Sequence, residues 1–359
     1  MRLRGAIINR TLTLAILLTF LSPPVYSAQR SDRIQLQLDS SEAAAVLSIL
    51  DKRAQRTTVT EADWQKLFAT VPYQRLKQRE TSMRRPFSDE EFKTFVSTLD
   101  SHRQQLHDTL NAWAKADLYS AAERTFQYLP AGAAIKAAVY PVIKPQKNSF
   151  VFEPDTNPSI FLYLDASVSS AQFENTVAHE LHHIGLSSLD ASYEQRIESL
   201  PENAHKAALW MGAFGEGMAV LAAAGSPDVP PLAAYPPRDQ TAWEVDYERA
   251  TSDLDDLNQF FLDVLHGDIK GDAVKHVAST FFGHRGPWYT VGYLMATTIE
   301  RQFGRAALVE TFGDAREFVA KYNLAASAHN AKGPDKLPLF SGELLQGVGV
   351  KSDGSTVNK

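Results

Sequence analysis

The chain has 359 residues, with 36 lysines and arginines against 42 aspartates and glutamates, a net charge of −6 and no cysteine. Without cysteine there are no disulfides and no cysteine-bound zinc, so the fold depends on its core and a metal could be held only by histidine and carboxylate. The negative net charge provides no electrostatic basis for binding nucleic acid.

Residues 1–28 predict a secretory signal peptide. Arg2, Arg4 and Arg10 form a basic start, residues 11–21 form an apolar run, and a Pro-Pro break precedes small residues at the cleavage site. The apolar run is about half the roughly 20 residues that a membrane helix needs. Cleavage after Ala28 removes three arginines and no acid, which takes the net charge from −6 to −9. We therefore expect an exported chain, periplasmic or secreted, with no membrane span after cleavage.

Residues 29–145 predict a helical N-terminal region. Apolar residues recur at helical spacing near residues 43–50, 92–99 and 106–118. Ser88 and Glu91 form a capping box at the start of the second of these helices. The region shows no catalytic pattern, and we expect it to support or shape the site.

Residues 146–340 predict the functional core, and residues 341–359 a C-terminal tail. Phe150–Phe152 and Ile160–Leu164 are short β-rich runs separated by a turn-rich segment. The expected fold class is therefore mainly α, with a small antiparallel β-sheet directly before the segment that carries the chemistry.

That segment is His179-Glu180-Leu181-His182-His183. On a helix, positions four apart lie one turn up and about 40° round, so His179 and His183 can face one metal ion. Glu180 lies about 100° from His179, which places it to reach a water on that metal and not to join as a ligand. Two histidine ligands with glutamate as general base are the arrangement of zinc metalloproteases.

The context of the motif predicts a buried helix. Ser169 can cap its start together with Gln172, and Gly185 is expected to stop it just after His183. An apolar stripe runs along the opposite flank at Phe173, Val177, Leu181 and Ile184.

A catalytic zinc site needs a third protein ligand. Asp190, seven residues after His183, is one candidate. Glu216 is the stronger one, because it lies in a predicted helix that opens with a capping box from Ser199 to Glu202 and ends at Gly225. Glycines at 212, 215 and 217 disfavour that helix by roughly 3 kcal/mol. Close approach of its backbone to the motif helix would compensate and bring Glu216 to the metal.

His-Glu-x-x-His followed on a second helix by Gly215–Ala219 resembles the gluzincin metallopeptidases. The runs at residues 128–130, 145, 148–152 and 179–185 resemble more closely a bacterial domain family of zinc-dependent peptidases, over most of the mature chain. The resemblance implies one zinc ion per chain on His179, His183 and Glu216, with Glu180 as the catalytic acid/base. Some gluzincins orient a ligand histidine through an acid shortly after the ligand glutamate, but Ala219 and Val220 stand there. Asp190 and Glu198 are open candidates for that role.

The segment Pro287–Gly292 resembles the Tyr-x-x-Gly of gluzincin aminopeptidases, in which the tyrosine donates a hydrogen bond to the oxyanion. Tyr289 is the first candidate for this role, with Tyr293 and His284 as alternatives. A phenol is a neutral donor with a pKa near 10, which suits the role.

Two functions compete. The first is an exported zinc peptidase that hydrolyses peptide bonds of a peptide or protein substrate with a zinc-activated water. The second is a non-catalytic binding or scaffold protein with a structural zinc site. Glu180 favours the enzyme, because a structural site needs no base beside its ligands.

Overall fold

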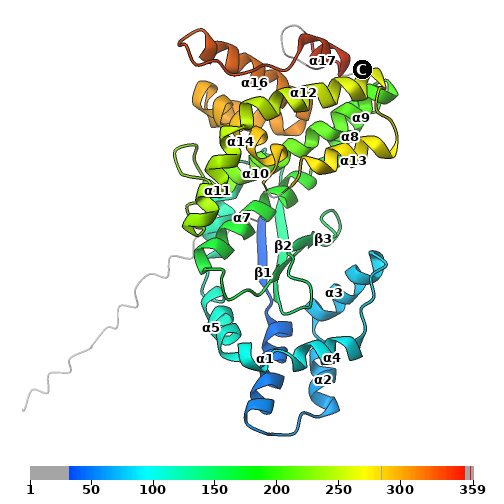
Figure 1. Cartoon of the computed structure of the whole chain (residues 1–359), viewed down its shortest axis with the longest axis vertical. Coiled ribbons are helices and arrows are strands. Elements are labelled where there is room, and N and C mark those ends of the chain that lie inside the picture. Colours follow the sequence, from blue (N-terminus) through cyan, green and yellow to red (C-terminus); the bar gives the residue numbers. More distant parts are fainter. Residues whose placement is uncertain (1–31, 284, 352–355, 357–359) are drawn as a thin grey trace, which may run out of the picture. The chain divides into compact units, whose positions relative to one another are not determined.

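The computed structural model describes residues 32–283, 285–351 and 356, without the side chains of residues 190–192. The predicted signal peptide lies outside the described residues. From Arg33 onward, the described residues belong to one compact unit. This unit is mainly helical with one small sheet (Figure 1).

Helices dominate the chain before residue 135, as predicted, although α2 and α3 had no counterpart in the periodicity. The elements up to residue 142 are β1 (Ile34–Leu38), α1 (Ser41–Ala54), α2 (Glu61–Phe68), α3 (Val71–Ser82), α4 (Asp89–Ser97), η1 (Asp100–His102), α5 (Arg103–Trp113), α6 (Leu118–Phe126) and β2 (Ile135–Val142). The predicted capping box is present at the start of α4, where the Ser88 side chain accepts a hydrogen bond from the Glu91 backbone N–H.

Two further short strands precede a second set of helices. The elements from residue 150 are β3 (Phe150–Phe152), β4 (Ser159–Tyr163), α7 (Ser170–Ser187), α8 (Asp190–Ile197), α9 (Glu202–Met211), η2 (Gly212–Phe214), α10 (Gly215–Ala224), α11 (Pro237–Glu248), α12 (Ala250–His266), α13 (Asp272–Thr280), α14 (Pro287–Phe303), α15 (Arg305–Val309), η3 (Glu310–Gly313), α16 (Ala315–Asn330) and α17 (Gly342–Gly347).

The sheet is mixed, which corrects the expected antiparallel sheet. Its strand order is β1-β2-β4-β3, and only β3 and β4 pair antiparallel. β1 pairs parallel to β2 with Ile34 opposite Ile135, and β2 pairs parallel to β4 with Val139 opposite Ile160. The local pattern predicted the β3–β4 pair correctly because a short turn joins those strands. The parallel pairs join segments separated by long connections, for which local sequence carries no signal.

The helix that carries the motif lies between two hydrophobic cores. Phe173, Val177, Leu181 and Ile184 are buried in the core formed with β1, β2, β4 and α1–α6. The second core is built mainly by α9–α17. Figure 1 accordingly shows α1–α5 and α12–α17 on opposite sides of the sheet and α7.

The ends of α7 confirm one prediction and correct another. The Ser169 side chain accepts a hydrogen bond from the Gln172 backbone N–H at 3.1 Å, as expected for the cap. Gly185 does not stop the helix, which continues to Ser187. A Cβ at residue 185 would collide with the side chain of Leu129, so this glycine provides room for a packed neighbour and not a helix end.

The helix that was expected to run unbroken to Ala224 is divided into α9, η2 and α10. It starts at Glu202 after Pro201, without the predicted side-chain cap from Ser199. Gly225, with φ +84°, ends it as predicted.

Gly217 brings α10 into backbone contact with α14. A Cβ at residue 217 would lie 2.5 Å from Gly292 Cα and still closer to the backbone of Tyr293, and a Cβ at Gly292 would lie 2.7 Å from the Phe214 carbonyl oxygen. The close approach predicted for this glycine-rich helix is therefore present, but its partner is α14 and not the motif helix. α10 contacts α7 through small residues instead, because Ala178 and Ala223 share a cluster with Ala121.

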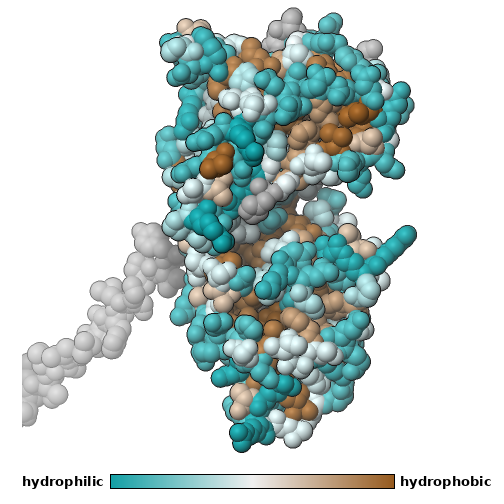
Figure 2. Space-filling model, viewed as in Figure 1, coloured by the Kyte–Doolittle hydropathy of each residue, from teal (hydrophilic) through white to brown (hydrophobic). Residues whose placement is uncertain are grey.

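Large apolar side chains that reach the surface are spread along the chain. They are Val71, Met83, Leu209, Val229, Val245, Phe303, Leu324 and Leu339. On the face drawn in Figure 2, hydrophobic groups are bordered by hydrophilic ones. By length and composition alone, residues Glu202–Ala224 could cross a membrane. However, 61% of their most apolar stretch is buried inside the protein, as in a core helix.

Glu42 is a buried acid at the start of α1. Its side chain is 0% exposed, and Oε2 accepts a hydrogen bond from the Ile143 backbone N–H at 2.9 Å, whereas Oε1 has no hydrogen-bond partner among the described residues. Burial raises the pKa of Glu42 to about 8, against the opposing effect of the Ile143 N–H. The folded protein therefore binds this proton more tightly than the unfolded chain does.

We predict that Gly217→Ala destabilises the protein, whereas Gly215→Ala does not. The added methyl at 217 meets backbone of α14, and overpacking of this kind costs about 1–3 kcal/mol. At 215 it meets nothing within 4 Å and gains up to about 1 kcal/mol of helix propensity. Urea unfolding of both variants measures the difference, and equal stability would contradict the close contact.

We predict that Glu42→Gln flattens the pH dependence of stability. The wild type should lose free energy of unfolding as the pH rises from about 4.5 to about 8, by up to about 1.4 kcal/mol per pH unit. Glutamine stays neutral and still accepts from Ile143. The variant should therefore be the more stable protein above pH 8, measured by urea unfolding at several pH values. Glu123→Gln, at an exposed position, is the control that should follow the wild type.

Candidate active site

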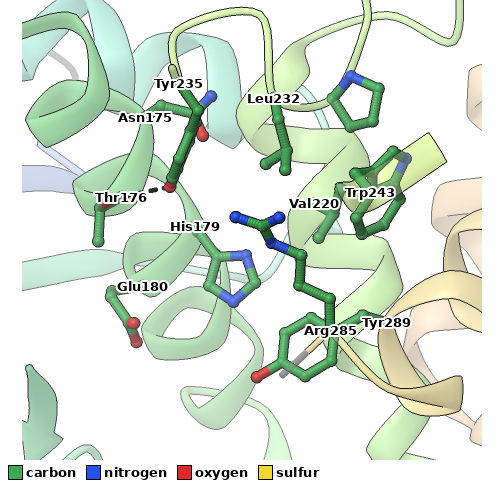
Figure 3. Close-up of a pocket in the computed structure, with 11 residues that line it drawn as sticks. Asn175, Thr176, His179, Glu180, Val220, Leu232, Tyr235, Trp243, Arg285 and Tyr289 are labelled. Carbon is green, nitrogen blue, oxygen red and sulfur yellow. Dashed lines mark hydrogen bonds between the residues drawn. The ribbon is translucent and has the colours of Figure 1, made fainter. Parts of the chain in front are cut away.

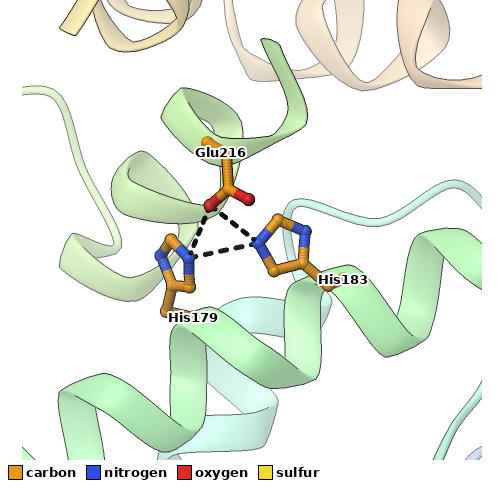
Figure 4. Close-up of side chains that lie close together, drawn as sticks. All are labelled: His179, His183 and Glu216. Atoms are coloured by element: carbon orange, nitrogen blue, oxygen red, sulfur yellow. Dashed lines mark hydrogen bonds and ion pairs between the residues drawn. The ribbon is translucent and has the colours of Figure 1, made fainter. Parts of the chain in front are cut away.

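His179 and His183 lie one turn apart on α7 and point to the same side of the helix (Figure 4). Their Nε2 atoms are 3.1 Å apart, and 17% and 28% of the two side chains remain exposed. Two histidine ring nitrogens this close to each other are typical of a site that binds a cation.

Glu216 reaches the same point from α10. Its Oε2 atom lies 3.2 Å from Nε2 of His179 and 3.2 Å from Nε2 of His183 (Figure 4). The three atoms therefore form a triangle with edges of 3.1–3.2 Å. Ligands about 2.0–2.1 Å from a tetrahedral zinc are separated by about 3.3–3.4 Å. The donor set and its geometry thus fit a zinc ion, with room for a fourth ligand on the open side.

The charges of these residues are arranged for a cation. Burial lowers the pKa of His183, but the carboxylate of Glu216 outweighs it and raises the pKa to about 9. Burial raises the pKa of the Glu216 carboxyl, yet the charge and hydrogen bonds of the two histidines hold it well below its ordinary value. A positive charge is therefore favoured between these side chains even without a metal.

Glu180 lies in the same pocket but outside the triangle. It lines a cavity of about 200 Å³ together with His179 and Tyr289 (Figure 3). Its negative charge contributes to the pKa shifts of His183, Tyr235 and Tyr289. Glu180 follows His179 on α7 and does not belong to the cluster of His179, His183 and Glu216.

Tyr289 enters the site from the first turn of α14. Its ring is stacked on that of His179 with centroids 6.2 Å apart and 15° between the planes. Burial raises the pKa of Tyr289 above its ordinary value, as do the charge of Glu216 and a hydrogen bond to it. The hydroxyl thus remains a neutral donor, and it is directed at the Glu216 carboxylate.

Of the two alternatives to Tyr289, Tyr293 does not line this pocket. Tyr293 is 6% exposed and packs edge-on against Trp243 and Tyr247 in the second core. His284 lies outside the described residues.

Neither acid proposed to orient the histidines is found in contact with them among the described side chains. The side chain of Asp190 is not among those described, and this leaves both its proposed roles as predictions. Glu198 is exposed at the end of α8. Among the described side chains, no hydrogen bond to Nδ1 of either His179 or His183 is found.

The third histidine of the motif is buried in the protein and lies outside the cluster of His179, His183 and Glu216. His182 is fully buried on the other flank of α7, where its Nε2 lies 3.3 Å from the Tyr128 carbonyl oxygen and its ring packs edge-on against Phe312. Burial holds the pKa of His182 well below its ordinary value, so the ring is neutral.

Much of the pocket wall was not predicted from the sequence. The remaining lining residues are Asn175, Thr176, Val220, Pro231, Leu232, Tyr235, Trp243 and Arg285. Asn175 and Thr176 lie on the motif helix one turn before His179, and this spacing alone could have identified them. The others come from α10, α11 and the surrounding loops, which only the tertiary structure brings together.

Comparison with known proteins identifies the family of the chain. The profile of the DUF5700 family, described as "Putative zinc dependent peptidase", matches residues 64–331, and the chain belongs to this family. The family description indicates a zinc-dependent peptidase. No curated protein matches the chain, and no solved structure matches it.

We predict that the purified protein binds one zinc ion per chain and releases it to a chelator. Glu216→Ala should weaken zinc binding by more than about 100-fold, because loss of an outer partner of a ligand already costs 10–100-fold. Glu198→Ala removes an exposed carboxylate and should bind like the wild type. Metal analysis and competition with a zinc-binding dye measure both. Full zinc occupancy in Glu216→Ala would contradict the assignment of this ligand.

Proposed function

We propose that this protein is an exported zinc metallopeptidase with a gluzincin-type site. The observation that carries the proposal is the convergence of His179, His183 and Glu216 at 3.1–3.2 Å, with the carboxylate of Glu180 in the same pocket but outside the ligand set. The family description supports the zinc-dependent peptidase class.

The roles of the residues follow from these positions. Zinc, when bound, lowers the pKa of a water molecule to about 7 and polarises a carbonyl oxygen. Glu180 would accept a proton from the attacking water and pass it to the leaving amine, because its carboxylate lines the pocket without an ion pair to any described residue. Tyr289, neutral and next to His179, is placed to donate a hydrogen bond to a developing oxyanion.

The shape of the pocket suits a peptide. Its walls combine apolar side chains, such as Leu232 and Trp243, with polar ones, such as Asn175. A second cavity of about 240 Å³ adjoins it, because both share Pro231, Leu232 and Trp243. An extended chain that crosses both cavities would place neighbouring side chains in successive pockets while its backbone passes the metal site.

Export is part of the proposal because residues 1–28 have the composition of a signal peptide and the chain has no cysteine to protect from oxidation. The competing function is a scaffold with a structural zinc site. The position of Glu180 disfavours it, since a structural site needs no base beside its ligands and Glu180 forms no ion pair with a described residue.

We predict that Glu180→Gln retains zinc and loses at least about 100-fold of peptidase activity, the lower range for lost acid–base catalysis. Glutamine has the size of glutamate but cannot accept the proton. His183→Ala should lose both metal and activity. Zinc content and cleavage of a peptide library measure the two properties separately. Full activity in Glu180→Gln would refute this mechanism, and zinc binding without cleavage of any peptide by the wild type would favour the scaffold.

A further inference from the structure

Arg285 is held in an unusual backbone conformation directly before α14. Its φ is +61°, in the left-handed region that side-chain-bearing residues rarely adopt. Gly286, which follows, is packed so tightly that a Cβ there would lie 2.9 Å from the Phe282 carbonyl oxygen and still closer to that of Phe281. Gly286 is thus packed against Phe281 and Phe282, just after α13, and this contact sets the direction in which the Arg285 side chain leaves the backbone. Backbone strain of this kind often occurs at functional sites.

The side chain of Arg285 lines the pocket that His179, Glu180 and Tyr289 also line. Figure 3 shows its guanidinium extending into that pocket. Only 13% of the side chain is exposed. A positive charge is thus kept within the cavity next to the metal site, between walls that include Leu232 and Trp243.

Asp239 anchors one side of the guanidinium and leaves the other available. Nη1 of Arg285 donates a hydrogen bond of 2.7 Å to the Asp239 carbonyl oxygen, and Nη2 lies 3.6 Å from Asp239 Oδ1. No ion pair within 4.0 Å joins Arg285 to Glu180 or Glu216 in the described part of the chain. Because a guanidinium has five N–H donors, several donors remain for a ligand in the pocket.

We propose that Arg285 binds a carboxylate of the substrate close to the scissile bond, and this rests on the proposed peptidase function. The carboxylate is either the free C-terminus of the peptide or the side chain of an acidic residue. A planar guanidinium matches a carboxylate with two parallel hydrogen bonds. The apolar walls exclude water and strengthen that pairing. Arg285 would therefore determine specificity, while Glu180 carries the chemistry.

The test measures binding by the zinc-loaded Glu180→Gln protein, so that no peptide is cleaved. The probes are N-acetylated tripeptides, each made as the C-terminal acid and as the amide. A second set carries an amidated C-terminus with glutamate or glutamine at one internal position. Calorimetry should show at least tenfold tighter binding for one carboxylate source. The first set identifies a C-terminal carboxylate, and the second identifies an acidic side chain.

Added to Glu180→Gln, Arg285→Gln should abolish that preference by weakening the acid forms at least tenfold and leaving the neutral forms unchanged. Arg285→Lys, which keeps the charge without the planar fork, should restore part of it. Arg238→Gln is the matched control, because Arg238 also lies near Asp239, at 4.0 Å, but its side chain is 91% exposed. Zinc content and thermal unfolding of each variant verify that the pocket is intact.

Equal affinity for acid and neutral forms would overturn the proposal, and so would an equal loss of both forms in Arg285→Gln or no binding of any acid. Cleavage assays on the protein that retains Glu180 distinguish failure of the proposed role of Arg285 from failure of the proposed peptidase function. Cleavage that ignores substrate charge would overturn the role of Arg285 and leave the peptidase function standing. A charge preference that depends on Arg285, without cleavage, would support the role of Arg285 and overturn the peptidase function.

Discussion

The backbone contact between α10 and α14 is the constraint on which the site depends. Gly217 and Gly292 allow the two helices to approach until main chain meets main chain. Glu216, the residue before Gly217, thereby reaches the histidines of α7. Tyr289, one turn before Gly292, is brought to His179 by the same contact. One helix pair in backbone contact at these two glycines therefore positions both a ligand candidate and a hydrogen-bond donor.

α7 connects this arrangement to the rest of the protein. Its apolar stripe is buried in the core that contains the sheet, and its polar flank faces α10 and α14, which belong to the other core. The histidines therefore stand on a helix that packing holds rigidly, while their partners come from separate elements. A metal ion bound there would join the two cores, since it would take ligands from a helix of each.

The charged groups that would bind a metal ion in this pocket are different from those that would act on the substrate. His179, His183 and Glu216 favour a cation at one point, as the raised pKa of His183 shows. Glu180 and Arg285 add a negative and a positive group to the lining of the same pocket, and no close ion pair joins them in the described structure. Each is consequently available to a ligand in the cavity. The motif helix would supply the chemistry, and the turn before α14 would supply the selection of substrate.

The sequence by itself determined the features that depend on neighbours along the chain. The spacing of His179 and His183, the cap at Ser169 and the buried stripe of α7 all follow from helical periodicity, and the structure contains them. Glu216 could be singled out because glycines in a helix need compensation, but the compensating partner is α14 and not α7. The parallel pairing of β1 with β2, and the entry of Arg285 into the pocket, were decided only by the tertiary structure. Both depend on contacts between distant segments, whose energies leave no periodic pattern in the sequence.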